Sequence, residues 1–70
     1  GGVGIPAPVA GTLLKHVVSE GSSVSVGQTV IIIESMKMEL EIKATAAGTV
    51  HFLAATGTQI SAGQTLAEIK

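Results

Sequence analysis

The sequence predicts an all-β fold, a flattened eight-stranded barrel or sandwich of two four-strand units related by a pseudo-twofold axis. The first observation behind this prediction is an internal repeat: residues 10–13 (AGTL) match 47–50 (AGTV), and residues 21–30 (GSSVSVGQTV) match 57–66 (GTQISAGQTL). Such a repeat indicates one supersecondary unit present twice, because neither copy alone could bury its apolar face. The spacing between the copies changes by one residue, and we expect their connecting loops to absorb the difference.

The second observation is a series of short strand-like runs. Residues 30–33 are β-branched throughout, which is typical of a strand buried on most sides. Residues 39–44 alternate charged and apolar side chains, as a strand with one wet and one buried face does. Residues 13–18 and 49–54 form two further apolar strands, and no stretch carries the apolar stripe of a helix.

Prolines and glycines punctuate these runs. Pro6 and Pro8 favour an extended conformation and remove backbone donors, so the entering segment, residues 5–9, should be an edge strand. Glycines recur at matching places in the two copies, where we expect turns; they are Gly11, Gly21, Gly27, Gly48, Gly57 and Gly63.

Length and composition limit what the chain can be. Seventy residues make one small domain, which we place at residues 5–70, with 1–4 as the tail of an upstream linker. A net charge of −1 without arginine argues against nucleic acid, and the wholly apolar run of residues 30–33 is too short to insert into a membrane.

No catalytic or metal-binding constellation is evident in the sequence. His16 and His51 lie at non-equivalent places of the two repeats and are interpreted as ordinary strand histidines. The loop serines have no evident base beside them. The absence of cysteine leaves no metal-ligand cluster, and no glycine-rich loop matches a phosphate-binding pattern. A non-catalytic domain is therefore expected.

One lysine is distinctive because of its neighbours. Lys37 lies between the two repeats, and the only methionines of the chain, Met36 and Met38, flank it. Methionine fills cores or forms adaptable recognition surfaces, and a short turn has no core to fill. The pseudo-twofold relation should place both termini at one end of the molecule and this hairpin turn at the other.

The segment from Glu34 to Glu39, with the sequence ESMKME, resembles the biotin attachment motif of biotin carboxyl carrier domains, usually written (E)-A-M-K-M. The resemblance extends from Ile5 to Ile69. Ser35 stands where the family usually has alanine, and because both are small we expect little effect. The short loop of residues 19–23 leaves no room for the protruding thumb of some members. The chain thus looks like the thumbless carriers of pyruvate and acyl-CoA carboxylases, transcarboxylase and sodium-pumping decarboxylases.

The resemblance implies a function and a set of partners. A biotin protein ligase would attach biotin covalently to Lys37, and the ligase and partner enzymes would recognise Met36 and Met38. The biotin arm would carry a carboxyl group between a biotin carboxylase or decarboxylase site and a carboxyltransferase site. The implied location is the cytoplasm or an organellar matrix, with any membrane reached through partner subunits.

Two alternatives remain open from the sequence. A lipoyl carrier domain also presents a hairpin lysine, but usually in a D-K-A context, whereas Met36 and Met38 flank Lys37 here. A β interaction module with an unmodified lysine is the other, in which the methionines would form part of a contact patch. The acyl group found on Lys37 distinguishes all three.

Overall fold

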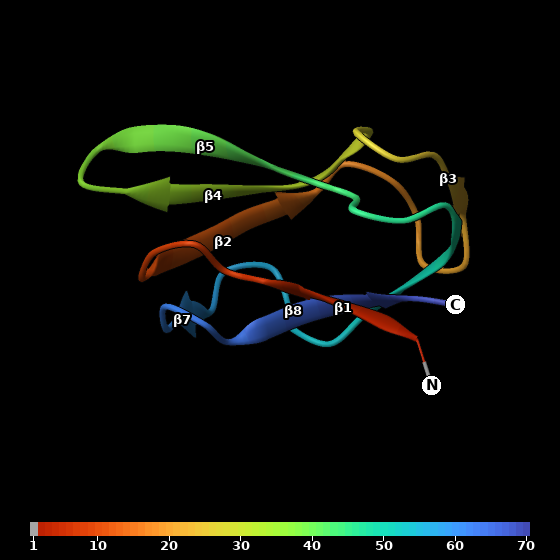
Figure 1. Cartoon of the computed structure of the whole chain (residues 1–70). Coiled ribbons are helices and arrows are strands. Elements are labelled where there is room, and N and C mark those ends of the chain that lie inside the picture. The colour runs from red at the N-terminus through yellow and green to blue at the C-terminus, as the bar shows by residue number, and fades with distance from the viewer. Residues whose placement is uncertain (1) are drawn as a thin grey trace.

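The computed structural model describes residues 2–70, which form eight strands and two four-stranded antiparallel sheets packed face to face (Figure 1). The sheet orders are β1-β8-β6-β3 and β5-β4-β2-β7, so the hydrogen bonding of the described residues does not close a barrel. The predicted all-β flattened sandwich is confirmed. The strands are β1 Val3–Pro6, β2 Gly11–His16, β3 Ser23–Val24, β4 Thr29–Ser35, β5 Met38–Lys43, β6 Gly48–Phe52, β7 Gln59–Ile60 and β8 Thr65–Ile69.

The two repeats interleave instead of forming one sheet each. One sheet combines β1 and β3 of the first repeat with β6 and β8 of the second, and the other combines β2 and β4 with β5 and β7. The pseudo-twofold relation exchanges β1 with β5, β2 with β6, β3 with β7 and β4 with β8. Interleaving lets every sheet span both repeats, so the core cannot form until both copies are present.

The core shows the repeat most directly. All fourteen buried hydrophobic residues fall into seven matched pairs, one member from each repeat. No polar or charged residue among those described is buried. Burying each large aliphatic side chain contributes roughly 1.5–3 kcal/mol, so both repeats contribute to the stability. The pairs are Ile5 with Ile42, Ala7 with Ala44, Leu13 with Val50, Val24 with Ile60, Val30 with Leu66, Ile31 with Ala67, and Ile33 with Ile69.

The one-residue difference between the repeats lies within a strand and not in a loop. The register of β2 against β4 shifts between Leu13 and Lys15, whereas β6 pairs with β8 without interruption. The extra residue is therefore Leu14, accommodated as a β-bulge in which two residues oppose one. The expectation that the loops absorb it was wrong, because a bulge leaves both following loops the same length.

The turn glycines separate into two classes. Gly21, Gly27, Gly57 and Gly63 have positive φ between 83° and 87°, as predicted for turns. Gly11 and Gly48 instead begin strands β2 and β6, so the prediction of a turn at these two positions was wrong. What excludes a side chain there is close approach to neighbouring backbone: a Cβ at Gly48 would lie 2.6 Å from the carbonyl oxygen of Lys70.

The strand bounds differ slightly from expectation at the entry. β1 is an edge strand as predicted, but it ends at Pro6, and Pro8 lies in a bend. Val3 and Gly4, which we expected in the linker tail, pair with Ile69 and Glu68 of β8. Gly1 lies outside the described residues.

Neither histidine stands free on its strand. His16 stacks on Phe52, its counterpart in the second repeat, with ring centroids 3.8 Å apart and an interplanar angle of 3°. Nε2 of His16 lies 2.9 Å from the carbonyl oxygen of Ala54. His51 Nδ1 contacts Oε2 of Glu20 at 2.7 Å, and Oε1 of Glu20 accepts the Phe52 N–H at 2.7 Å. Glu20 thus joins the loop after β2 to β6.

Candidate functional site

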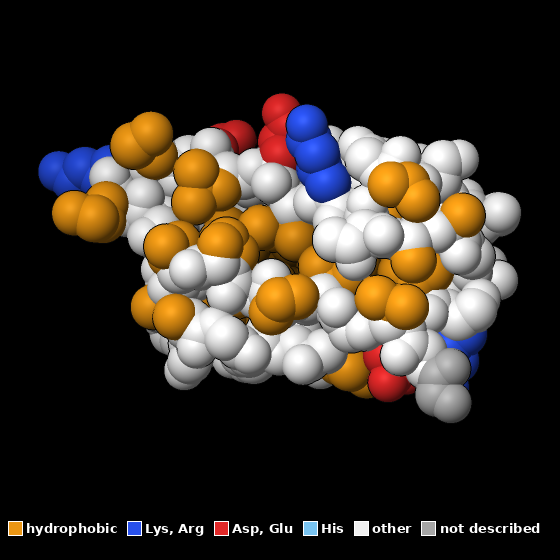
Figure 2. Space-filling view, viewed as in Figure 1, with side chains coloured by type: hydrophobic (Ala, Val, Ile, Leu, Met, Phe, Trp, Pro, Cys, Tyr) orange, Lys and Arg blue, Asp and Glu red, His pale blue; other side chains and the backbone are white. Residues whose placement is uncertain are grey.

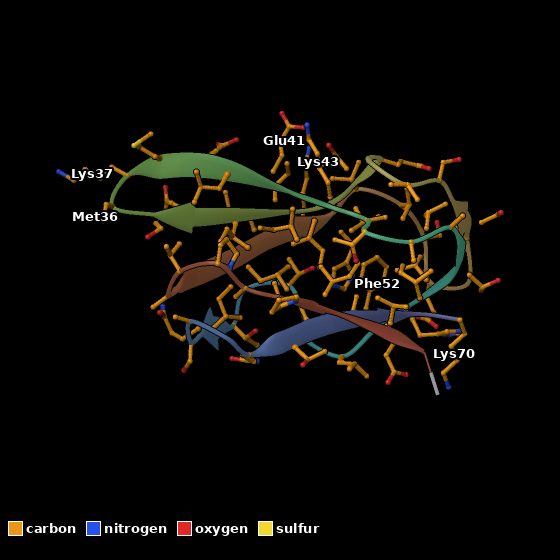
Figure 3. All side chains as sticks on the ribbon, viewed as in Figure 1. Met36, Lys37, Glu41, Lys43, Phe52 and Lys70 are labelled. Carbon is orange, nitrogen blue, oxygen red and sulfur yellow. The ribbon has the colours of Figure 1, made fainter. Side chains whose placement is uncertain are left out.

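The β4–β5 hairpin ends in a two-residue turn. Ser35 pairs with Met38, so Met36 and Lys37 alone connect the strands. Figure 3 shows Met36 and Lys37 at the tip, with the lysine side chain directed away from the molecule. The described chain, residues 2–70, begins and ends at the opposite end of the molecule (Figure 1), as the repeat predicts. Lys37 is therefore presented as far as the fold allows from the ends of the chain.

The turn backbone adopts an uncommon conformation. Met36 and Lys37 have φ of 52° and 66°, and they are the only non-glycine residues with positive φ among residues 2–70. Positive φ at both central residues is what a type I′ hairpin turn requires, and such turns usually contain Asn-Gly. An L-residue in this region is less stable by about 1–2 kcal/mol. The remaining structure must hold the turn in place.

The two methionines are exposed and fill no core. Met36 is 93% exposed and Met38 63%. Figure 2 shows a basic side chain projecting at this end of the molecule with hydrophobic side chains beside it. An exposed, flexible and polarizable side chain on each side of a lysine forms an adaptable contact surface. The structure thus places the three predicted site residues together at one tip.

The electrostatic surroundings leave the lysine side chain untethered. Within residues 2–70, Lys70 pairs with Glu68 at 3.7 Å, and Glu20 makes its close side-chain contact at 2.7 Å with His51. The exposed carboxylates Glu34 and Glu39 flank the hairpin without pairing to Lys37. Nζ can therefore enter the active site of another protein without breaking an ion pair.

Lys37 differs from the other three lysines in its backbone setting. Lys15 and Lys43 lie within strands β2 and β5, and Lys70 follows β8. Lys37 alone occupies a turn. A modifying enzyme that reads turn shape would therefore select this lysine over the others.

The remaining structural features of the described residues concern pockets, metal sites and membrane-spanning helices. Residues 2–70 contain no pocket and no group of three or more His, Cys, Asp or Glu arranged to hold a metal ion. No helix in this part of the chain is long and apolar enough to cross a membrane.

Sequence reasoning missed one residue at the base of the hairpin. Gly11, taken for a turn residue, packs against the backbone of Glu34 at the end of β4. The signal was present in the A-G-T repeat, which recurs at Gly48. The sequence does not reveal the close approach of the two strands, which an added side chain at this position would have to push apart.

Comparison with known proteins places the chain in a family. The family model described as biotin-requiring enzyme, of the biotin/lipoyl group, matches residues 3–69. A biotin carboxyl carrier protein of Streptococcus mutans is 46% identical over 66 residues, which are 93% of this chain and 51% of that protein. This chain thus spans about half the length of that relative.

Solved structures share the architecture. The urea carboxylase of Kluyveromyces lactis superimposes with a TM-score of 0.93 at 34% identity, over 100% of this chain and 6% of that one. The lipoyl domain of the 2-oxoglutarate dehydrogenase complex from Azotobacter vinelandii gives a TM-score of 0.80 at 23% identity, over 97% of this chain and 95% of that one. The second likeness concerns the fold alone.

Proposed function

The chain belongs to the biotin/lipoyl family of biotin-requiring enzymes, and on that premise we propose that it is a biotin carboxyl carrier domain with biotin attached to Nζ of Lys37. The observation that supports this most is the two-residue turn. It presents a single lysine between two exposed methionines, at the end of the fold opposite the termini. In this proposal the domain catalyses nothing itself.

The residues present suit covalent attachment of biotin. Forming the amide bond between biotin and a lysine requires an accessible amine and no enclosing cavity. Lys37 is exposed. A lysine ammonium is protonated in neutral water and is then no nucleophile, so the ligase must remove that proton. The turn fixes the direction in which the Lys37 side chain leaves the backbone, and Met36 and Met38 supply apolar contact area beside it. Biotin, once bound, supplies the ureido nitrogen that carries the carboxyl group.

A carrier must visit several active sites in turn. The described residues form a small body with extents of 30 × 19 × 18 Å, and the hairpin turn with the proposed site lies at one end of it. Tethering such a body to an enzyme raises its effective concentration at each active site. We therefore propose as partners a biotin protein ligase, and biotin carboxylase with carboxyltransferase or decarboxylase subunits.

The test uses one variant of the proposed acceptor and one matched control. Lys37→Arg keeps the positive charge and removes the amine that can be acylated, while Lys43→Arg makes the same change on β5. After incubation with a biotin protein ligase, ATP and biotin, the wild type and Lys43→Arg should carry biotin on a streptavidin blot and Lys37→Arg should not. Biotin on folded Lys37→Arg would refute the site.

A lipoyl function has weaker support. The likeness to a solved lipoyl domain falls below 25% identity and therefore concerns only the fold. Methionines stand on both sides of Lys37, whereas an acidic residue usually precedes a lipoyl lysine. This context favours biotin over lipoate. The same variants incubated with a lipoate ligase test this alternative directly.

A further inference from the structure

The base of the Lys37 hairpin rests on the first residue of β2. A Cβ built on Gly11 would overlap the carbonyl oxygen of Glu34 and would lie 3.3 Å from Cβ of Ser35. Ser35 is the last residue of β4 before the turn. Glycine at position 11 therefore allows backbone-to-backbone contact at the point where the hairpin leaves the sheet.

Beyond this contact the hairpin has no further neighbour in the sheet. β2 pairs with β4 from His16 opposite Ile31 to Thr12 opposite Glu34, and the remaining pair at the tip joins only Ser35 and Met38. Figure 1 shows the β4–β5 arm extending past the end of β2. A two-stranded arm takes its direction from its base, so a shift at Glu34 is passed on to Lys37.

We propose that Gly11 is a positioning residue for Lys37: it sets the place of the hairpin relative to the body of the domain. This inference rests on the proposed attachment of biotin at Lys37. It adds that the ligase reads the domain body together with the tip, so that the amine reaches its reaction partner only when the arm has its native direction.

The substitution Gly11→Ala tests this role because it acts only through the steric contact of the added methyl group. The φ of Gly11 lies outside the positive range that disfavours side chains, so an alanine is compatible with the backbone conformation. Its Cβ would push the Glu34 carbonyl away by a distance on the order of 1 Å. A misplacement of this size at a reacting group can lower a rate about 100-fold.

The pseudo-twofold relation provides a matched control. Gly48 begins β6 as Gly11 begins β2, and a Cβ there would lie 2.6 Å from the carbonyl oxygen of Lys70 and 3.0 Å from Cγ2 of Ile69. Its φ of 152° adds backbone strain to any substitution. Figure 3 shows Lys70 at the end of the molecule opposite Lys37. Gly48→Ala therefore imposes a smaller steric clash together with backbone strain, both away from the hairpin.

The experiment measures the steady-state kinetics of biotinylation with the 70-residue chain as substrate of a biotin protein ligase. Assays of the wild type, Gly11→Ala and Gly48→Ala are run in trimethylamine N-oxide, which favours the folded state. A variant that is only less stable lowers the folded concentration, so its apparent KM rises and its kcat is unchanged. A misplaced amine lowers kcat and kcat/KM together.

We expect kcat of Gly11→Ala to fall roughly 10- to 100-fold. The NMR amide resonances of residues 34–38 should shift in the same variant. Gly48→Ala should keep the wild-type kcat. Unchanged kcat in Gly11→Ala would overturn the proposal. An equal kcat loss in both variants, or Gly11→Ala that stays unfolded in the osmolyte, would also overturn it, because Gly11 would then serve the fold in general. A wild type that takes up no biotin would instead refute the proposed function.

Discussion

Met36 and Lys37 hold a backbone conformation that their own side chains disfavour. Positive φ at two consecutive non-glycine residues is strained, and Asn-Gly would be the stable choice for this turn. Strain of this kind often accompanies binding sites, where the neighbouring structure maintains it. In this domain the strain coincides with the residue proposed to carry biotin.

Replacing Met36 with glycine should stabilise the fold. Met36 is 93% exposed, so few contacts are lost, and glycine adopts positive φ without a steric penalty. We expect the free energy of unfolding to rise by up to about 1 kcal/mol, measured by urea denaturation. Met38→Gly is the control of opposite sign, since glycine within a strand is destabilising by roughly 0.5–1 kcal/mol. A less stable Met36→Gly would contradict the strained-turn interpretation.

The same variant should be a poorer substrate of the ligase. If Met36 contributes contact area, Met36→Gly loses it although the turn is retained, and kcat/KM for biotinylation should fall several-fold. The comparison with Met36→Leu, which keeps apolar area, separates side-chain recognition from turn shape. Equal kcat/KM for the wild type and both variants would exclude recognition of this side chain.

Glu20 should make the stability depend on acidity. The pKa of Glu20 lies below its ordinary value of 4.5. The main cause is the hydrogen bond that its carboxylate accepts from the backbone N–H of Phe52, and the second is the side-chain hydrogen bond with His51. The folded state thus favours the carboxylate. Its stabilisation is present above pH 4.5 and is lost as pH falls through the lowered pKa. Glu20→Gln retains a carbonyl acceptor for Phe52 but cannot titrate.

Thermal unfolding of both proteins between pH 6 and pH 3 checks this prediction. We expect the wild type to be the more stable of the two above pH 4.5, with the difference in Tm shrinking toward acid. A difference in Tm that stays constant across the series would show that Glu20 does not titrate with folding.

At the scale of elements, the turns before β4 and β8 are built alike. Gly27 N–H donates to the Ala44 carbonyl and Gly63 N–H to the Ala7 carbonyl, each at 2.8 Å. A side-chain carbonyl closes each turn as well, since Gln28 and Gln64 each accept a backbone N–H at 2.9 Å. This explains why G-Q recurs in both copies of the repeat.

Alanine at either turn glycine should lower stability by about the same amount. Gly27 and Gly63 have φ of 87° and 85°, and nothing lies within 4 Å of an added Cβ, so only backbone strain of roughly 1–2 kcal/mol acts. Asparagine tolerates this conformation better and should be less destabilising at both positions. Urea denaturation of the four variants provides the measurement. Unequal losses for the two alanine variants would contradict the equivalence of the turns.

The elements also show how far sequence alone reaches. The alternation of residues 39–44 predicted β5 because it reflects local geometry, and the turns at Gly27 and Gly63 follow from local backbone preference. The bulge at Leu14 and the close approach at Gly11 could not be predicted in this way. Both depend on which strands become neighbours, which a local pattern does not encode.

At the scale of the whole molecule, the repeat predicted the placement of the site. Seven matched core pairs require a near-symmetric body, and in such a body the single connection between the copies must lie opposite the two ends. The location of the Lys37 turn therefore followed from the sequence. The left-handed backbone conformation of Met36 and Lys37 could not be predicted from the sequence, because neither residue type prefers it.

In the proposed carrier function, the whole molecule would act as a spacer between its point of attachment and the tip that carries biotin. The arrangement of termini and hairpin at opposite ends would carry biotin away from whatever the domain is joined to. The chain has four lysines, of which only Lys37 lies in a turn. Selective modification of one of them is the central requirement of the proposed function.

Peptide mapping by mass spectrometry, after incubation of the chain with a biotin protein ligase, ATP and biotin, tests that requirement most directly. We expect one biotinyl group per chain, confined to the peptide that contains Lys37. Biotin distributed over Lys15, Lys43 and Lys70 would contradict selection by the turn. A folded chain that takes up no biotin from an active ligase, but accepts lipoate at Lys37 from a lipoate ligase, would contradict the carrier function proposed here.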